Sequence, residues 1–318
     1  MGVPGLLHVG LPKTGTTALQ RFVLSRHPGI EYFSLSANGG DLSFQDEWDA
    51  FIERVVMQDP LFHDHARGRR FVEERVHASV RPGRVLLVSS EELTSRFGVG
   101  MAEKAGRASR LFPGYRVVLV IRHPVAWLQS DYLQHVCNLQ RRPFQYSAPS
   151  MDGLLREATE RPDHPLSPLL GIQFARIAAQ YVAHFGRENV KVMLYEDFAE
   201  RPESFLESLS RFCGIDPDAA VRCYRENGKA VNVRRDLEQV IYVHLYRNRH
   251  GRRLPMRIRR RVARYIARLP QARRHFLELS AETAARIADA AAPECDAVSA
   301  EWDLETGRHG YPTLAGSG

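Results

Sequence analysis

Short apolar segments of strand length alternate with amphipathic helical patterns along the first two thirds of this chain. The strand-like segments cover residues 5–10, 84–89, 116–121 and 190–195. The helical patterns that we assign between and after them cover residues 18–24, 44–58, 66–81, 101–112, 124–136, 167–185 and 202–213. Continuous apolar strands separated by helices are typical of a parallel sheet with helices on both faces. The sequence therefore predicts an α/β fold with a central parallel sheet, flanking helices and a helical C-terminal portion.

The organisation of the chain favours a single domain over residues 1–318. No internal repeat and no low-complexity linker divides the sequence. Its 44% apolar and 25% charged residues are ordinary for a globular protein and exclude a disordered or collagenous chain. The four cysteines show no disulfide or zinc-ligand spacing, and no apolar run is long enough to span a membrane. We therefore expect a soluble protein of the cytoplasm without a structural metal.

Positive charge is concentrated in one C-terminal segment, residues 247–274. The chain carries a formal charge of +7, and no Asp or Glu occurs between Gln239 and Leu277, where twelve arginines lie. Apolar residues within this segment recur at helical spacing, at Ile258, Val262, Tyr265, Ile266 and Leu269. This basic amphipathic helix either contacts an anionic membrane or polyanion, or packs on the core with a solvated arginine face. Without interleaved aromatic residues, nucleic acid is not expected as a partner.

A glycine-bearing loop follows the first strand-like segment. Gly10 and Gly15 have the G-x4-G spacing of a phosphate-binding loop, but Lys-Ser/Thr does not follow Gly15 as a nucleotide triphosphatase requires. The lysine instead lies inside the loop, at Lys13, where it can reach the bridging oxygen of a leaving phosphate. The hydroxyls of Thr14, Thr16 and Thr17 and the backbone N–H groups of the turn complete a candidate anion site.

A second candidate anion site follows the strand-like segment 116–121. Arg122 stands at the carboxyl end of this segment, where ligands bind in open α/β sheets. The planar donor fork of arginine suits a phosphate group. Ser130 lies eight residues further on, just over two helical turns into the following helix.

Together these two strings resemble the PAPS-dependent sulfotransferases, in particular soluble bacterial ones, where PAPS is 3′-phosphoadenosine 5′-phosphosulfate. Pro12 to Thr17 is similar to the family's 5′-phosphosulfate loop, and Arg122 to Tyr132 to its 3′-phosphate motif. The resemblance implies a P-loop-like fold, PAPS as co-substrate, adenosine 3′,5′-bisphosphate as product and no metal. It also implies acceptor-side insertions, here about residues 36–66 and 137–168. The residues that the resemblance assigns to the nucleotide are Lys13, Thr14, Gly15, Thr16, Thr17, Arg122 and Ser130.

Further nucleotide contacts are implied where the chain matches the family less closely. Tyr195, after the last strand-like segment, either contacts the adenine or packs in the core. Lys229, Asn232 and Arg234 stand where the family often has a late basic loop over the 3′-phosphate, and they are otherwise a solvated loop.

A carboxylate is needed as general base, because the acceptor hydroxyl must lose a proton. In several branches of the family the base follows the strand before the 3′-phosphate motif, which here reads Ser90-Glu91-Glu92. We expect Glu91 first and Glu92 second to act with Lys13 as catalytic residues, although the pair could equally cap the next helix. Glu31 and Asp41 are the runner-up bases.

The function that these residues indicate is transfer of the sulfuryl group from PAPS to a hydroxyl of a carbohydrate, glycolipid or other small acceptor. Two alternatives stay open at the level of sequence. One is a kinase with a variant phosphate-binding loop, which the position of Lys13 and the lack of a clear strand-end Asp for magnesium disfavour. The other is a non-enzymatic protein that binds a membrane or a polyanion through residues 247–274.

Overall fold

The computed structural model describes residues 5–34, 51, 56–94, 100–136, 150–164, 167–227, 237–247 and 250–316. The chain divides into two compact units. The first unit comprises Met1–Arg122, Gln173–Val231 and Ala297–His309. The second comprises His123–Ile172, Asn232–Asp296 and Gly310–Gly318. None of the described helices is both long and apolar enough to cross a membrane.

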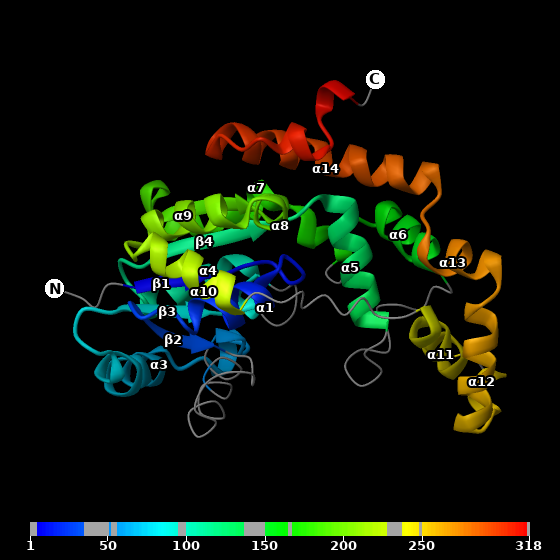
Figure 1. The fold of residues 1–318 in the computed structure, drawn as a ribbon, viewed down its shortest axis with the longest axis horizontal. Coiled ribbons are helices and arrows are strands. Elements are labelled where there is room, and N and C mark those ends of the chain that lie inside the picture. The colour runs from blue at the N-terminus through cyan, green and yellow to red at the C-terminus, as the bar shows by residue number, and fades with distance from the viewer. Residues whose placement is uncertain are drawn as a thin grey trace. The chain divides into compact units, whose positions relative to one another are not determined.

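The first unit is built on a parallel sheet of five strands in the order β2-β3-β1-β4-β5 (Figure 1). The strands are β1 (Gly5–His8), β2 (Ile30–Ser34), β3 (Val85–Ser89), β4 (Arg116–Ile121) and β5 (Val190–Leu194). Every paired neighbour runs parallel, with His8 opposite Ser89 on one side of β1 and opposite Val118 on the other. The predicted α/β fold with a central parallel sheet is confirmed. Because all strands run the same way, their carboxyl ends and the loops that follow them meet at one edge.

Helices cover this sheet because its strands are apolar on both faces. The helices of the unit are α1 (Thr16–Leu19), α3 (His65–Phe71), α4 (Met101–Leu111), α7 (Phe174–Phe185), α8 (Tyr195–Glu200), α9 (Pro202–Cys213) and α10 (Pro217–Asn227). A wider helical turn, Gln20–Leu24, continues α1. One core cluster joins Leu6 and Val118 of the sheet to Leu19 of α1 and Leu206 of α9. Helix α7 packs against β4 and β5.

The edge strand β2 is absent from the sequence prediction. Its sequence IEYFS has no continuous apolar run, and Glu31, Tyr32 and Phe33 are only half-buried. An edge strand has a neighbour on one side only, so it needs less apolar surface than the central strands. The Glu31 carboxylate is held there by Arg81 at 2.8 Å and Arg84 at 3.6 Å.

The second unit is helical, in line with the predicted helical C-terminal portion. Its helices are α5 (Pro124–Val136), α6 (Met151–Glu160), α11 (Leu237–Arg247), α12 (Met256–Ala267), α13 (Pro270–Leu277) and most of α14 (Ala281–Trp302). A small core of Ile241, Ala263 and Ala272 joins α11, α12 and α13. Asp152 of α6 accepts hydrogen bonds from the backbone and the hydroxyl of Ser280, at 2.7 and 2.8 Å, ahead of α14.

Candidate active site

The loop between β1 and α1 contains two residues with left-handed backbone angles. Lys13 and Gly15 both adopt left-handed backbone angles, with φ of +70° and +75°. The hydroxyl of Thr14, between them, donates to the carbonyl of Leu11 at 2.6 Å. Left-handed residues in a short turn create the concave arrangement of N–H groups that binds anions. Thr16, the first residue of α1, is buried, whereas Thr17 is exposed.

Arg122 joins this loop to the end of β4. Its guanidinium donates to the carbonyl of Lys13 at 3.0 Å, and its Cζ atom lies 4.8 Å from the ring centre of Tyr195. The Nε atom of Arg122 is buried and has no hydrogen-bond partner among the described residues. The two motifs that the sequence singles out therefore meet at one place. The Nε–H group of Arg122 remains there as a charged donor without a partner among the described residues.

Tyr195 lies against the loop and also packs against the core cluster of the first unit. A Cβ atom added to Gly15 would come within 2.8 Å of the Tyr195 ring and 3.3 Å of Phe198. The ring is half-buried and faces the arginine. The sequence leaves two interpretations of Tyr195 open, and the ring contacts both Arg122 and the core cluster. Glycine is required at position 15 on two grounds, its positive φ and this close approach.

Glu91 lies beside the same loop, in a short helical turn (Glu91–Leu93) that follows β3. Its carboxylate accepts a hydrogen bond from the hydroxyl of Thr16. Burial raises the pKa of Glu91, the Thr16 hydroxyl and the charge of Lys13 lower it, and the neighbouring Glu92 raises it. Because burial is the largest of these effects, the pKa of Glu91 lies above its ordinary value.

The backbone of Glu92 makes two hydrogen bonds. The carbonyl of Glu92 accepts a hydrogen bond from Nζ of the buried Lys104 at 2.8 Å, and its N–H donates to Ser90 at 3.1 Å. The hydroxyl of Thr94, at the end of this turn, lies 3.2 Å from the carbonyl of Gly10. These contacts fix the turn against the loop, so the position of Glu91 depends on residues outside the two motifs.

A buried polar cluster under the loop was missed at the level of sequence. Nδ1 of His8 lies 2.8 Å from the hydroxyl of Ser89, and the side-chain amide of Gln20 donates to that hydroxyl at 2.8 Å. Because Gln20 donates to Ser89, the hydroxyl proton of Ser89 is free to point at His8. Burial lowers the pKa of His8 to about 4. His8 and Ser89 are opposite each other in the parallel register of β1 and β3. The cluster could be predicted from sequence only if these two strands were known to be neighbours.

The other candidate residues belong to other segments of the chain. Ser130 is half-buried in α5, within the second unit, and Glu31 is held on β2 by Arg81 and Arg84. Four others, Asp41, Lys229, Asn232 and Arg234, lie outside the described residues. In the part of the chain that the structure describes, no three His, Cys, Asp or Glu side chains group as metal ligands would.

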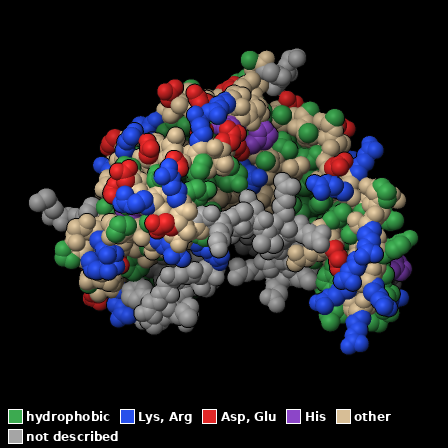
Figure 2. Space-filling view, in the orientation of Figure 1, with side chains coloured by type: hydrophobic (Ala, Val, Ile, Leu, Met, Phe, Trp, Pro, Cys, Tyr) green, Lys and Arg blue, Asp and Glu red, His purple; other side chains and the backbone are tan. Residues whose placement is uncertain are grey.

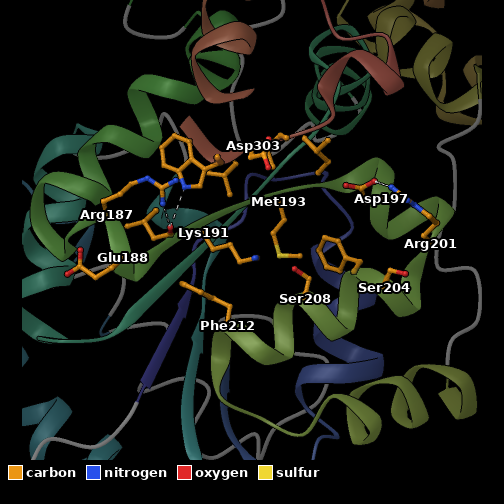
Figure 3. A pocket seen from close by; sticks show the side chains of 16 residues that line it. Arg187, Glu188, Lys191, Met193, Asp197, Arg201, Ser204, Ser208, Phe212 and Asp303 are labelled. Carbon is orange, nitrogen blue, oxygen red and sulfur yellow. Dashed lines mark hydrogen bonds and ion pairs between the residues drawn. The ribbon is translucent and has the colours of Figure 1, made fainter. Parts of the chain in front are cut away.

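An open hollow of about 460 Å³ lies elsewhere in the first unit, along β5. Its walls come from β5, α9 and residues 302–304, and none of the loop residues lines it. Lys191 and Ser208 point into it (Figure 3). Burial lowers the pKa of Lys191, whose ammonium lies 5.8 Å from the ring centre of Phe212. This hollow contains no paired anion-binding motif and is not the candidate active site.

The sheet, the loop with Lys13 and the strand-end arginine define an α/β protein with an anion site at the carboxyl edge of its strands. A family model described as the sulfotransferase family matches residues 4–219, and this chain belongs to that family. It is therefore a sulfuryl-transferring enzyme, of a family for which PAPS is the usual co-substrate. This finding overturns the alternative of a kinase with a variant loop and that of a protein without enzymatic activity.

A solved structure gives the same fold. The chain is similar to a sulfotransferase from Alicyclobacillus acidocaldarius, with 19% identity and a TM-score of 0.54 over 97% of this chain and 100% of that one. It is also similar to the mouse sulfotransferase SULT7A1 complexed with PAP, with 14% identity and a TM-score of 0.45 over 96% and 87% of the two chains. A search of curated protein sequences returns no match.

Proposed function

We propose that this enzyme transfers the sulfuryl group from PAPS to a hydroxyl of a carbohydrate, glycolipid or other small acceptor, by in-line displacement. The observation that carries the proposal is the contact between Arg122 and the Lys13 loop, with Tyr195 against both. The residues fit a doubly anionic nucleotide. The loop offers turned N–H groups and hydroxyls, and Arg122 has a buried donor atom without a partner in the described chain.

In the proposed assignment the loop and Lys13 act on the 5′ side of the nucleotide. Thr14, Gly15, Thr16 and Thr17 hold the 5′-phosphate, and the Lys13 ammonium stabilises the negative charge that develops on the leaving phosphate oxygen. Stabilising charge that appears only in the transition state raises the rate of the chemical step. Because the sulfuryl group carries less charge than a phosphoryl group, no metal is assigned to this step.

Arg122 is assigned to the 3′-phosphate and Tyr195 to the adenine. The described hydrogen bond uses one terminal nitrogen of Arg122, so its other N–H groups are available for phosphate oxygens. Ser130 and the late basic residues Lys229, Asn232 and Arg234 remain assigned to the same phosphate by the family resemblance alone.

Glu91 is assigned as the general base, with Glu92 as the second choice. Its raised pKa makes it a stronger proton acceptor than an ordinary glutamate, which favours proton removal from a hydroxyl. Thr16 has a single hydroxyl proton, and it donates that proton to Glu91 in this structure. If the hydroxyl turns to a bound 5′-phosphate, Glu91 loses this hydrogen bond and becomes more basic. Nucleotide binding thus prepares the base.

A sulfate-transfer screen tests the proposal. The purified chain is incubated with ³⁵S-labelled PAPS and with carbohydrate, glycolipid and phenolic acceptors, beside the Lys13→Ala and Glu91→Gln variants. We expect label on at least one hydroxyl acceptor with the parent chain and strong loss in both variants. Transfer that is unchanged in Lys13→Ala would overturn the assignment of the loop.

Location in the cytoplasm stays a prediction from the cysteine usage.

A thermal-shift measurement separates nucleotide binding from turnover. Adenosine 3′,5′-bisphosphate should raise the melting temperature of the parent chain, and ATP with magnesium should raise it less, because the loop lacks the triphosphate lysine position. Equal shifts with the two nucleotides would contradict the predicted preference for a 3′-phosphate.

A further inference from the structure

The outer side of α12 presents arginines and large apolar side chains together. Its inner side packs through Ala263 and Ile266 against α11 and α13. Arg259 is buried on that side as well, where it donates to the carbonyls of Gly251 and Leu254 at 3.2 and 2.8 Å and lies over the ring of Tyr246. The inner side of the helix is therefore filled, and the outer side has to be explained separately.

The helical spacing places Ile258 and Tyr265 on the apolar side of this helix, but both side chains are exposed. Ile258 is 47% exposed and Tyr265 is 68% exposed, whereas Val262 and Ile266 are partly buried. Residues seven apart lie almost two full turns apart on one side of a helix, so Ile258 and Tyr265 form one strip. Met256 at the start of the helix is also 55% exposed. A helix whose outer side served only to keep arginines in water would not need large exposed apolar side chains there.

Exposed arginines occur on α12 and on the segments directly before and after it, and few of them pair with an acid among the described residues. Arg264 pairs with Glu238 at 3.4 Å. Seven further exposed arginines have no ion-pair partner among the described residues: Arg253, Arg257, Arg260, Arg261, Arg268, Arg273 and Arg274. Figure 2 shows Lys and Arg side chains gathered over α12, with apolar side chains beside them. Unneutralised charge of one sign attracts a surface of the opposite sign.

We propose that the outer side of α12 docks on the surface of an anionic lipid bilayer. Arginines alone would suit any polyanion. Ile258 and Tyr265, in contrast, favour binding only where their apolar surfaces are removed from water. An interfacial helix does both, since its apolar strip enters the boundary of the acyl chains while its arginines reach the headgroups along flexible stems. Tyr265 is suited to that boundary because its ring is apolar and its hydroxyl is polar. The proposal does not depend on the identity of the acceptor.

The docking is tested by co-sedimentation of the full chain with vesicles. Phosphatidylcholine vesicles are compared with vesicles that contain phosphatidylglycerol, at low and at high salt. We expect binding to the anionic vesicles only, and weaker binding at high salt, because ions screen exposed charges. Each arginine near an anionic surface contributes about a five-fold gain in binding, so the double variant Arg261→Gln/Arg268→Gln should bind about 25-fold more weakly.

The apolar strip is tested with Ile258→Ser/Tyr265→Ser, and the matched charge control is Arg69→Gln/Arg211→Gln, two exposed arginines of the first unit. The strip variant should lose vesicle binding while it keeps binding to soluble heparin, and the control should bind vesicles like the parent. Melting curves by circular dichroism check that every variant is folded. Vesicle binding that is unchanged in the strip variant, or binding to heparin without binding to vesicles, would overturn the proposal in favour of a soluble polyanion.

Discussion

Arg122 donates a hydrogen bond to the backbone carbonyl of Lys13 at 3.0 Å, across 109 positions of sequence. The contact is possible because β1 and β4 are neighbours in the sheet, so the loop after one strand and the residue after the other leave the same edge. The geometry of the loop and the position of the guanidinium are therefore set together. A change at Arg122 acts on the loop as well as on any phosphate that the arginine binds.

Substitution of Arg122 is expected to weaken nucleotide binding more than a loss of charge alone would. Hydrogen bonds to charged groups contribute about 1.5–3 kcal/mol, so Arg122→Gln should weaken the binding of adenosine 3′,5′-bisphosphate by about 10- to 100-fold. Arg122→Lys should recover only part of this, because lysine lacks the planar fork. Isothermal titration calorimetry measures both, with Arg211→Gln as an exposed control. Full recovery by lysine would contradict a role for the fork.

Lys13 is expected to show a trade-off between stability and activity. Its φ of +70° is unfavourable for any residue with a Cβ, at a cost of about 1–2 kcal/mol. In urea unfolding, the free energy of unfolding of Lys13→Gly should therefore exceed that of Lys13→Ala by roughly 1 kcal/mol. Both variants should lose about 10²–10³ in kcat, as for removal of one donor to the transition state. If Lys13→Gly were no more stable than Lys13→Ala, the loop would not hold this backbone geometry in solution.

The parts of the site that the sequence predicts are those carried by local spacing. The strand, the loop around Lys13 and the arginine at the end of a strand are each visible within a few residues, because strand ends and turns are set by local sequence. The edge strand at residues 30–34 is missed since its burial is one-sided, and no pattern of continuous apolar residues marks it.

The contacts between distant segments are beyond the reach of the sequence. Thr16 and Glu91 are 75 positions apart, and Tyr181 reaches the carbonyl of Leu93 at 2.8 Å across 88 positions. Such pairs depend on strand order, which a pattern along one chain does not contain. The exposure of Ile258 and Tyr265 is of the same kind, because helical periodicity gives the apolar positions but not which of them meet a neighbour.

The acid side of the pH–rate profile is expected to report Glu91. As a base Glu91 must be ionised, so kcat/KM for PAPS, which reports the nucleotide-free enzyme, falls as the pH drops through its pKa. Burial places that fall above the range of an ordinary glutamate. Thr16→Val removes a hydrogen bond that lowers this pKa, so the fall should move to higher pH. Thr16→Ser keeps the hydroxyl and should leave the profile in place. Glu91→Gln should abolish the fall and reduce kcat by about 10²–10⁴.

A coincidence of the Thr16→Val and Thr16→Ser profiles would contradict the assignment of that hydrogen bond. Retention of the acid-side fall in Glu91→Gln would move the role of base to another carboxylate, with Glu92→Gln as the next variant to measure.

His8 is expected to make the stability of the chain depend on pH between about 4 and 6.5. Burial lowers the pKa of His8 to about 4, whereas the unfolded chain has the ordinary value near 6.5. In this window the unfolded state binds the proton and the folded state does not, so the free energy of unfolding rises with pH, by about 3 kcal/mol in total. His8→Gln should remove that slope, and His275→Asn, an exposed control, should retain it. Urea unfolding at several pH values measures each slope. A parent chain with the same slope as His8→Gln would show that His8 is protonated in the folded state and that its contact with Ser89 is not the neutral one inferred from Gln20.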